Sequence, residues 1–111
     1  MWHKGLAMVL MAFFSLAACQ PNTFQEGERL YKANCANCHL DDGKGLGALI
    51  PPLAGADYLS QNRERLACIL RHGLNDTIVV NGVTYAEKMP GVPTLTDIQV
   101  ANLLNFINNS W

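Results

Sequence analysis

The chain has 111 residues, enough for one small domain, and half of them are hydrophobic. Eight Lys and Arg residues stand against nine Asp and Glu residues, so the formal net charge is only −1. The sequence holds no basic run and no stripe of basic and aromatic residues, so nucleic acid is not an expected partner.

Residues 1–18 have the layout of a secretory signal peptide. Lys4 precedes an uncharged apolar run that ends in small residues and is shorter than the ~20 residues that a spanning helix needs. The run ends in Leu-Ala-Ala-Cys19, which resembles the lipobox of bacterial lipoproteins and implies cleavage before Cys19 and lipid attachment to its thiol. An ordinary signal peptide with an incidental cysteine is the alternative. We expect a signal peptide at 1–18, a lipid anchor and short tether at 19–23 and the functional domain at 24–111. The protein would then be exported and lipid-anchored to the extracytoplasmic or periplasmic face of a bacterial membrane.

A helix from Phe24 to about Ala36 is predicted at the start of the domain. Thr23 and Glu26 have the spacing of a capping box, in which each side chain bonds the backbone of the other at a helix start. The helix leads directly into a cluster of two cysteines and a histidine. Residues 41–56 follow with four glycines and two prolines, and this composition predicts an irregular loop.

The rest of the chain predicts two more helices and one hairpin. Residues 61–72 form the first of these helices, and Asn81-Gly82 between two β-branched runs predicts a tight hairpin. Thr96 and Gln99 repeat the capping-box spacing and begin the closing helix. Its apolar residues recur at helical spacing: Val100, Leu103, Leu104, Ile107 and Trp111. The fold class is therefore all-α, with long loops and a small β-hairpin.

The cluster Cys35-Ala-Asn-Cys38-His39 allows three chemistries. Zinc could be bound by Cys35 and Cys38 together with Cys68 and His72, but His39 would then have no role. A redox-active dithiol would need the cysteines at the start of a helix that follows a strand, whereas here they follow a helix. Haem attachment uses all three residues, because the thiols form thioethers with the vinyl groups and the adjacent histidine is the proximal iron ligand. The cluster therefore favours haem.

The second iron ligand is expected to be Met89. It is the one methionine of four that remains after removal of the signal peptide. Pro90 and Pro93 stiffen its loop, and such a loop can hold a soft thioether over a metal. His72 is the competing ligand.

The sequence from about residue 24 to 111 resembles the class I mono-haem cytochromes c of the small bacterial lipoprotein kind. The motifs that carry the resemblance occur in the family's order: Cys35 to His39, Gly43 to Gly47, Pro51-Pro52-Leu53, a helix near Leu66 to Leu70, Met89-Pro90 and a closing helix from Asp97. The resemblance implies a haem-enclosing helical fold, one covalently bound haem c per chain, and redox proteins such as dehydrogenases, oxidases or other cytochromes as partners.

The resemblance also implies roles for residues around the haem. The Pro51 carbonyl, or that of Pro52, would accept the second N–H of His39, and Leu53 would pack on the haem face. It implies as well a contact between the first and last helices, made by Gly27, Tyr31, Leu103 and Phe106. Met89 is the sixth ligand on this ground too.

The expected function is that of a membrane-tethered carrier of single electrons in a respiratory chain rather than an enzyme. With both axial positions of the iron filled by His39 and Met89, electrons would move by outer-sphere transfer. One alternative is a dedicated haem subunit of one dehydrogenase or oxidase complex, and another is a five-coordinate haem sensor or peroxidase. Cys68 has no partner in the carrier interpretation and is expected to be a buried thiol that packs as a small apolar residue.

Overall fold

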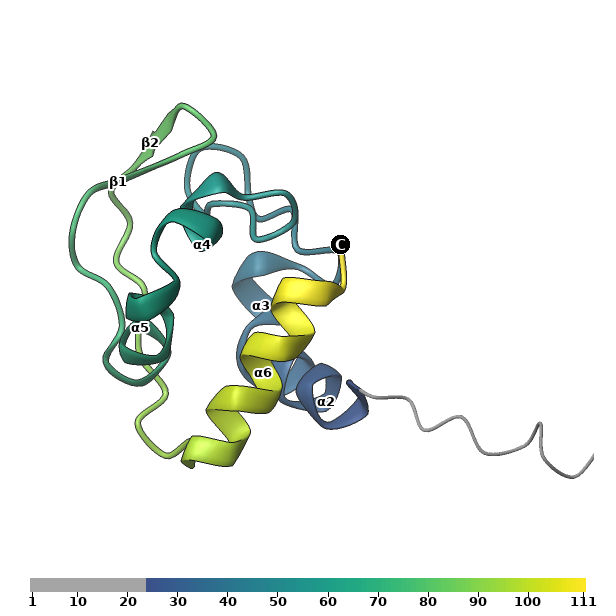
Figure 1. The fold of residues 1–111 in the computed structure, drawn as a ribbon. Coiled ribbons are helices and arrows are strands. Elements are labelled where there is room, and N and C mark those ends of the chain that lie inside the picture. Colours follow the sequence, from purple (N-terminus) through teal and green to yellow (C-terminus); the bar gives the residue numbers. More distant parts are fainter. Residues whose placement is uncertain (1–23) are drawn as a thin grey trace, which may run out of the picture.

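Two helices from opposite ends of the domain cross and form one side of the molecule (Figure 1). They are α2 (Gln25–Asn34) and α6 (Asp97–Asn109) in the computed structural model, which describes residues 24–111. Between them the chain forms α3 (Ala36–His39), α4 (Asp57–Gln61), the 3-10 helix η2 (Arg63–Arg65), α5 (Leu66–His72) and strands β1 (Ile78–Val80) and β2 (Val83–Tyr85). The predicted all-α class with a small hairpin is confirmed.

The crossing of α2 and α6 depends on a glycine. A Cβ on the buried Gly27 would lie 2.6 Å from the Cβ of Phe106 and against the Asn102 carbonyl, so only glycine permits this approach. Tyr31 packs its ring 5.4 Å from that of Phe106, centroid to centroid, and shares a buried core with Leu103. The expected contact between the first and last helices is therefore present. It offsets the cost of about 0.5–1 kcal/mol that glycine carries inside a helix.

The C-terminal residue closes an aromatic cluster over the start of the glycine-rich loop. The prediction that Trp111 continues the helical stripe of α6 is wrong, because the helix ends at Asn109. The Trp111 ring instead lies 5.3 Å from the Tyr31 ring and 5.7 Å from the Phe106 ring. A Cβ on Gly43 would lie 3.0 Å from the indole, so the loop passes directly beneath it.

The capping box predicted for α6 is confirmed. The Gln99 N–H donates to the Thr96 hydroxyl at 3.3 Å, and the Thr96 N–H donates to the Gln99 side-chain oxygen at 3.0 Å. For the box predicted at the first helix, Thr23 lies outside the described residues. The Glu26 carboxylate there accepts hydrogen bonds from Arg29, at 2.7 and 2.9 Å.

The helix predicted over residues 61–72 is interrupted at its beginning. At Asn62 the backbone leaves helical geometry, with φ −128° and ψ 32°, and its side-chain amide donates to the Tyr58 carbonyl at 2.9 Å. The same carbonyl also accepts the Asn62 backbone N–H at 3.1 Å, so both donors of Asn62 meet Tyr58 where the unpredicted helix α4 ends. The chain then passes through η2 into α5, whose end at His72 agrees with the prediction.

The Asn81-Gly82 hairpin is confirmed, and its tip is bound to α4. The two residues have φ values of +52° and +79°, as a two-residue turn between Val80 and Val83 requires. The Asn81 N–H donates to the Asp57 carboxylate at 2.7 Å, and the Asp57 N–H donates to the Asn81 side-chain oxygen at 3.0 Å. The hairpin and α4 therefore form one unit, seen at the top of Figure 1.

The described helices are short. None of those between residues 24 and 111 is long and apolar enough to cross a membrane.

Candidate functional site

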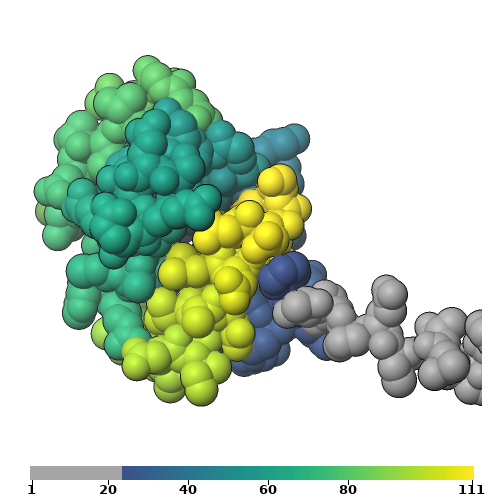
Figure 2. All heavy atoms as spheres, in the orientation of Figure 1, coloured from purple at the N-terminus to yellow at the C-terminus, as the bar shows by residue number. Residues whose placement is uncertain are grey.

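Two adjoining cavities lie in the interior, with about 670 and 820 Å³ of empty space when their open mouths are counted. They share seven lining residues: Cys35, His39, Pro51, Leu70, Leu74, Ile78 and Met89. Because of this shared wall we describe them together as the crevice. On the face shown in Figure 2, the α4–α5 segment lies against α6, so helices from both sides of the crevice meet there.

A break in the first helix places the two cysteines of the cluster. Cys35 leaves helical geometry, with φ −122° and ψ −35°, and α3 begins again at Ala36. Cys35 is therefore buried while Cys38, one turn later, is exposed, and both line the larger cavity. Burial raises the pKa of the Cys35 thiol to about 11, and the neighbouring Cys38 adds to this. A redox-active cysteine needs a lowered thiol pKa, so the dithiol interpretation has no support here.

The zinc interpretation is wrong for the described residues. Between residues 24 and 111, no three His, Cys, Asp or Glu side chains gather as a metal site would require. Cys68 and His72 lie on exposed positions of α5, away from the buried Cys35. The expectation of a buried Cys68 is also wrong, because Leu66 and Leu70 take the core-facing side of α5 and position 68 falls on the opposite side.

His39 is buried with one ring nitrogen already bonded. Its side chain is 7% exposed, and Nδ1 lies 3.0 Å from the Pro51 carbonyl oxygen. Burial lowers the pKa of the imidazole below its ordinary value, while the bond to Pro51 acts in the opposite direction. The neutral ring donates its Nδ1 proton to the carbonyl and keeps a lone pair on Nε2, which has no partner among residues 24–111. This is the form of histidine that binds metals.

The glycine-rich loop brings Pro51 to His39. At Gly45 the φ angle is +71°, and a Cβ there would lie 2.6 Å from the Pro51 oxygen. The Gly43 carbonyl accepts the N–H of Leu53 at 2.7 Å, which closes the loop. Leu53 is partly buried and lines the smaller cavity, as does Pro52.

The loop that carries Met89 is fixed to the end of α5. Met89 and Leu74 exchange two backbone hydrogen bonds, both 2.9 Å, and the Val92 N–H donates to the Leu70 carbonyl at 2.7 Å. A Cβ on Gly91 would lie 2.6 Å from the His72 carbonyl carbon, so glycine is needed for this approach. Met89 thereby lines both cavities, as His39 does.

The family model described as cytochrome c matches residues 24–111, the whole of the described part. The chain belongs to the cytochrome c family. It is 38% identical over 112 residues to cytochrome c-552 of Thermus thermophilus, an alignment that covers 97% of this chain and 72% of that protein. It is 35% identical to the cytochrome c subunit of a quinone alcohol dehydrogenase from Gluconobacter oxydans, over 77% of this chain and 18% of the relative. A gluconate 2-dehydrogenase cytochrome c subunit of Pantoea cypripedii is also 35% identical, with 20% of its length covered.

The chain is thus a class I mono-haem cytochrome c, whose covalently bound haem c serves electron transfer. The crevice of this cytochrome fits the group in its chemistry. The wall of the smaller cavity is almost entirely hydrocarbon, whereas the larger cavity is also lined by Asn34, Asp76, Glu87 and Lys88. Together they combine two cysteines, a neutral histidine and a methionine thioether. Cys19 lies outside the described residues.

Several crevice residues could not be recognised from the sequence. Leu74 pairs with Met89, Ile78 and Val80 enter from β1, and Tyr58 comes from α4. In β1, Ile78 is partly and Val80 fully buried around the exposed Val79, but all three residues are apolar, so the sequence carries no alternation that shows which side of the strand faces inward.

Proposed function

We propose that this cytochrome c carries single electrons at a membrane surface, with haem attached through Cys35 and Cys38 and with His39 and Met89 as axial ligands. The observation that carries the proposal is the shared crevice: His39 and Met89 line the same two cavities, and each is fixed by backbone hydrogen bonds nearby. A bound haem c supplies a one-electron ferric–ferrous couple.

Two side chains of this protein, His39 and Met89, would influence the reduction potential of this ferric–ferrous couple. His39 presents a neutral imidazole whose orientation is held by the Pro51 carbonyl, which also raises its strength as a ligand. Met89 offers a soft thioether, which favours the ferrous state and raises the reduction potential. If His39 and Met89 both hold the iron, no site for substrate would remain open, and the electron would pass by outer-sphere transfer.

A mobile carrier and a dedicated subunit of one enzyme differ in the domains and proteins to which the haem domain is attached. The chain covers 18–20% of its dehydrogenase-subunit relatives but 72% of the first cytochrome c-552. The 38% identity to cytochrome c-552 supports a carrier that exchanges electrons with redox proteins. The five-coordinate sensor or peroxidase has no comparable support, because the Met89 backbone is held at the crevice on both its N–H and its C=O.

The test of the axial ligands uses protein made with haem-maturation machinery. We expect the haem to remain on the chain through denaturation, and Met89→Ala to abolish the far-red absorption typical of an iron–thioether bond. His72→Ala, at the competing position, should leave that absorption unchanged. A Met89→Ala spectrum identical to the parent would reject Met89, and release of haem on denaturation would reject covalent attachment.

The tether rests on the sequence around Cys19, which supports export and lipid attachment at the membrane. Cys19→Ser should move the protein from the membrane fraction to the soluble fraction, because the acyl chains would have no thiol to join. Cys68→Ser is the matched control and should stay with the membrane. Membrane association of the Cys19→Ser protein as tight as that of the parent would argue against the anchor.

A further inference from the structure

The hairpin belongs to a longer two-stranded ribbon that ends at Met89. Strands β1 and β2 are paired from Ile78, opposite Tyr85, up to the turn, and a separate antiparallel bridge pairs Leu74 with Met89. This bridge lies four residues from the Ile78–Tyr85 pair along either strand, so the bridge and the hairpin share one antiparallel register. We therefore call residues 74–89 the ribbon. The turn is its tip, and the pair of Leu74 and Met89 is its base.

One face of the ribbon lines the larger cavity. Side chains alternate between the two faces along a strand, and residues directly opposite each other share a face. Apart from Lys88, the ribbon residues that line this cavity are three opposite pairs: Leu74 and Met89, Asp76 and Glu87, Ile78 and Tyr85. Met89 thus faces the crevice because of the register, and a slip of one residue would turn its side chain to the other face.

The middle of the ribbon lacks a backbone ladder. No backbone hydrogen bond joins residues 75–77 to residues 86–88, all of which belong to the described part of the chain. Asp76 falls opposite Glu87 there, and like charges in opposite positions destabilise a strand pair. A two-stranded ribbon is only marginally stable in water even with a complete ladder. The base of the ribbon therefore depends on supports outside it.

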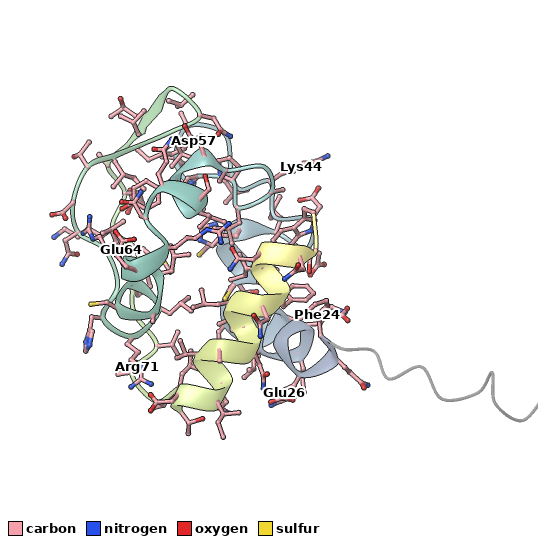
Figure 3. The ribbon with its side chains drawn as sticks, viewed as in Figure 1. Phe24, Glu26, Lys44, Asp57, Glu64 and Arg71 are labelled. Atoms are coloured by element: carbon pink, nitrogen blue, oxygen red, sulfur yellow. The ribbon has the colours of Figure 1, made fainter. Side chains whose placement is uncertain are left out.

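The tip of the ribbon has such a support in α4. Asp57 and Asn81 exchange two hydrogen bonds of 3.0 and 2.7 Å, and in each the backbone N–H of one residue donates to the side-chain oxygen of the other. Asp57, labelled in Figure 3, lies at the start of α4 beside the hairpin. These bonds prevent the tip from moving away from α4. Because one register runs from tip to base, they also restrain Met89.

We propose that Asp57 and Asn81 are positioning residues for Met89, which hold the base of the ribbon, and with it the thioether, in place from the opposite end. The inference rests on the proposed function, because it requires Met89 as an iron ligand. Release of the tip would let the ribbon open locally more often, and Met89 would leave the iron more often in the open ribbon. The attachment through Cys35 and Cys38 is covalent, so it would be unaffected.

The first test is Asn81→Gly in the ferric holoprotein. Glycine adopts the positive φ of this turn without strain but lacks the side-chain oxygen that accepts the Asp57 N–H. In excess imidazole, which occupies the iron whenever Met89 leaves it, loss of the far-red absorption measures the rate of Met89 release. We expect this rate to rise about two- to tenfold, as the loss of one hydrogen bond predicts. An equal rate in Asn81→Gly and the parent would overturn the inference.

Val79→Thr is the matched control for this variant. Val79 is exposed in the same hairpin, and threonine keeps its shape and its branching at Cβ. The bonds between Asp57 and Asn81 stay intact, so Met89 should be released at the parent rate. A rise in Val79→Thr as large as that in Asn81→Gly would show that any change in the hairpin has the same effect, and would overturn the role of the two bonds.

The second test exchanges the two side chains. Asn81→Asp alone brings a second carboxylate against Asp57 and should speed the release of Met89, because the like charges repel. Asp57→Asn combined with Asn81→Asp again gives one carboxylate and one amide, and both side-chain oxygens remain as acceptors. The release rate should then return to within about twofold of the parent. A double variant as fast as Asn81→Asp alone would overturn the inference.

Amide hydrogen exchange shows whether the effect reaches the base of the ribbon. In Asn81→Gly, the N–H groups of Leu74 and Met89 should exchange faster by about the same factor as Met89 is released, since both processes require local opening. The amides of Tyr31 and Leu103, where α2 meets α6, should exchange as in the parent. Faster exchange confined to the tip would overturn the inference, and so would an equal increase throughout the domain.

The inference and the proposed function fail in different ways. A parent holoprotein without far-red absorption would reject Met89 as a ligand, and with it both proposals. Far-red absorption in the parent, together with parent-like release rates in Asn81→Gly and Asn81→Asp, would reject the inference and leave the proposed function standing.

Discussion

Tyr31 illustrates how one side chain joins three parts of the molecule. Its ring packs on Phe106 and Trp111, and its hydroxyl donates to the Leu40 carbonyl at 2.6 Å, next to His39. Burial raises the pKa of this phenol above its ordinary value, and nearby Cys35 and aspartate charges add to the effect. The neutral phenol is therefore the form that the fold stabilises.

Tyr31→Phe should weaken the protein and change its response to alkaline pH. The free energy of unfolding at neutral pH should fall by about 1 kcal/mol, because the bond to Leu40 is lost. In the parent, the contribution of Tyr31 is complete below the ordinary tyrosine pKa of about 10 and decreases as pH rises above it. Tyr31→Phe should therefore lose stability less steeply above that pH. Denaturant unfolding from pH 7 to 11 measures both effects.

The control for this prediction is Tyr85→Phe, which removes a different buried tyrosine and leaves the bond to Leu40 intact. In this variant the Tyr31 phenol should keep its raised pKa, because its burial and its bond to Leu40 are unchanged. An equal slope in Tyr31→Phe and the parent would contradict the role given to Tyr31.

Individual site residues can be recognised from the sequence when they follow a fixed spacing, or when theirs is the one residue of its type in the domain. Cys35, Cys38 and His39 are recognised from their spacing, and Met89 because it is the one methionine beyond the signal segment. Tyr58, which lines the smaller cavity with a buried hydroxyl that has no partner within residues 24–111, could not be found, because such burial depends on three-dimensional neighbours.

Among the elements, those with strong local signals were the predictable ones. The hairpin follows from Asn81-Gly82 and the closing helix from Thr96 and Gln99, because both patterns act within a few residues. Helix α4 is too short for a hydrophobic period, and it ends at Gln61, after which Asn62 leaves helical geometry. The error at Cys68 arose because Leu66 and Leu70, one turn apart, share the buried side of α5, and position 68 between them falls on the opposite side.

Gly91→Ala tests whether the Met89 loop depends on its close approach to α5. The added methyl group would meet the backbone of residues 71–73, including the His72 carbonyl carbon at 2.6 Å, so the loop must move. We expect the free energy of unfolding to fall by about 1–3 kcal/mol, the range for an overpacked site. The far-red iron–thioether absorption should also weaken, because the bonds between Met89 and Leu74 would be strained.

Thr94→Ala is the control for this loop, since Thr94 is exposed in the same segment. It should preserve both the stability and the absorption. Full far-red absorption in Gly91→Ala would show that the approach to α5 is not what holds Met89 at the iron.

At the scale of the whole molecule, the two sides of the crevice differ in how they are held. Helices α2 and α6 contact each other directly through Gly27 and the aromatic cluster. On the other side, α4 and the hairpin turn Tyr58, Ile78 and Val80 toward the cavities. The stability of α4 and the hairpin therefore depends more on the group that fills the crevice. Local sequence patterns do not reveal this dependence.

Removal of the haem should accordingly unfold the molecule unevenly. In hydrogen exchange followed by mass spectrometry, we compare the holoprotein with the same chain made without haem-maturation machinery and kept reduced. Amides of α4, α5 and the hairpin should lose at least about tenfold more protection than those of α2 and α6, because opening free energies are set locally by buried contacts. The two hydrogen bonds between Asp57 and Asn81 should open with this side, since they are exposed and join α4 to the hairpin. A uniform loss of protection along the chain would mean that the haem holds both sides equally, and that contact between α2 and α6 cannot persist without it.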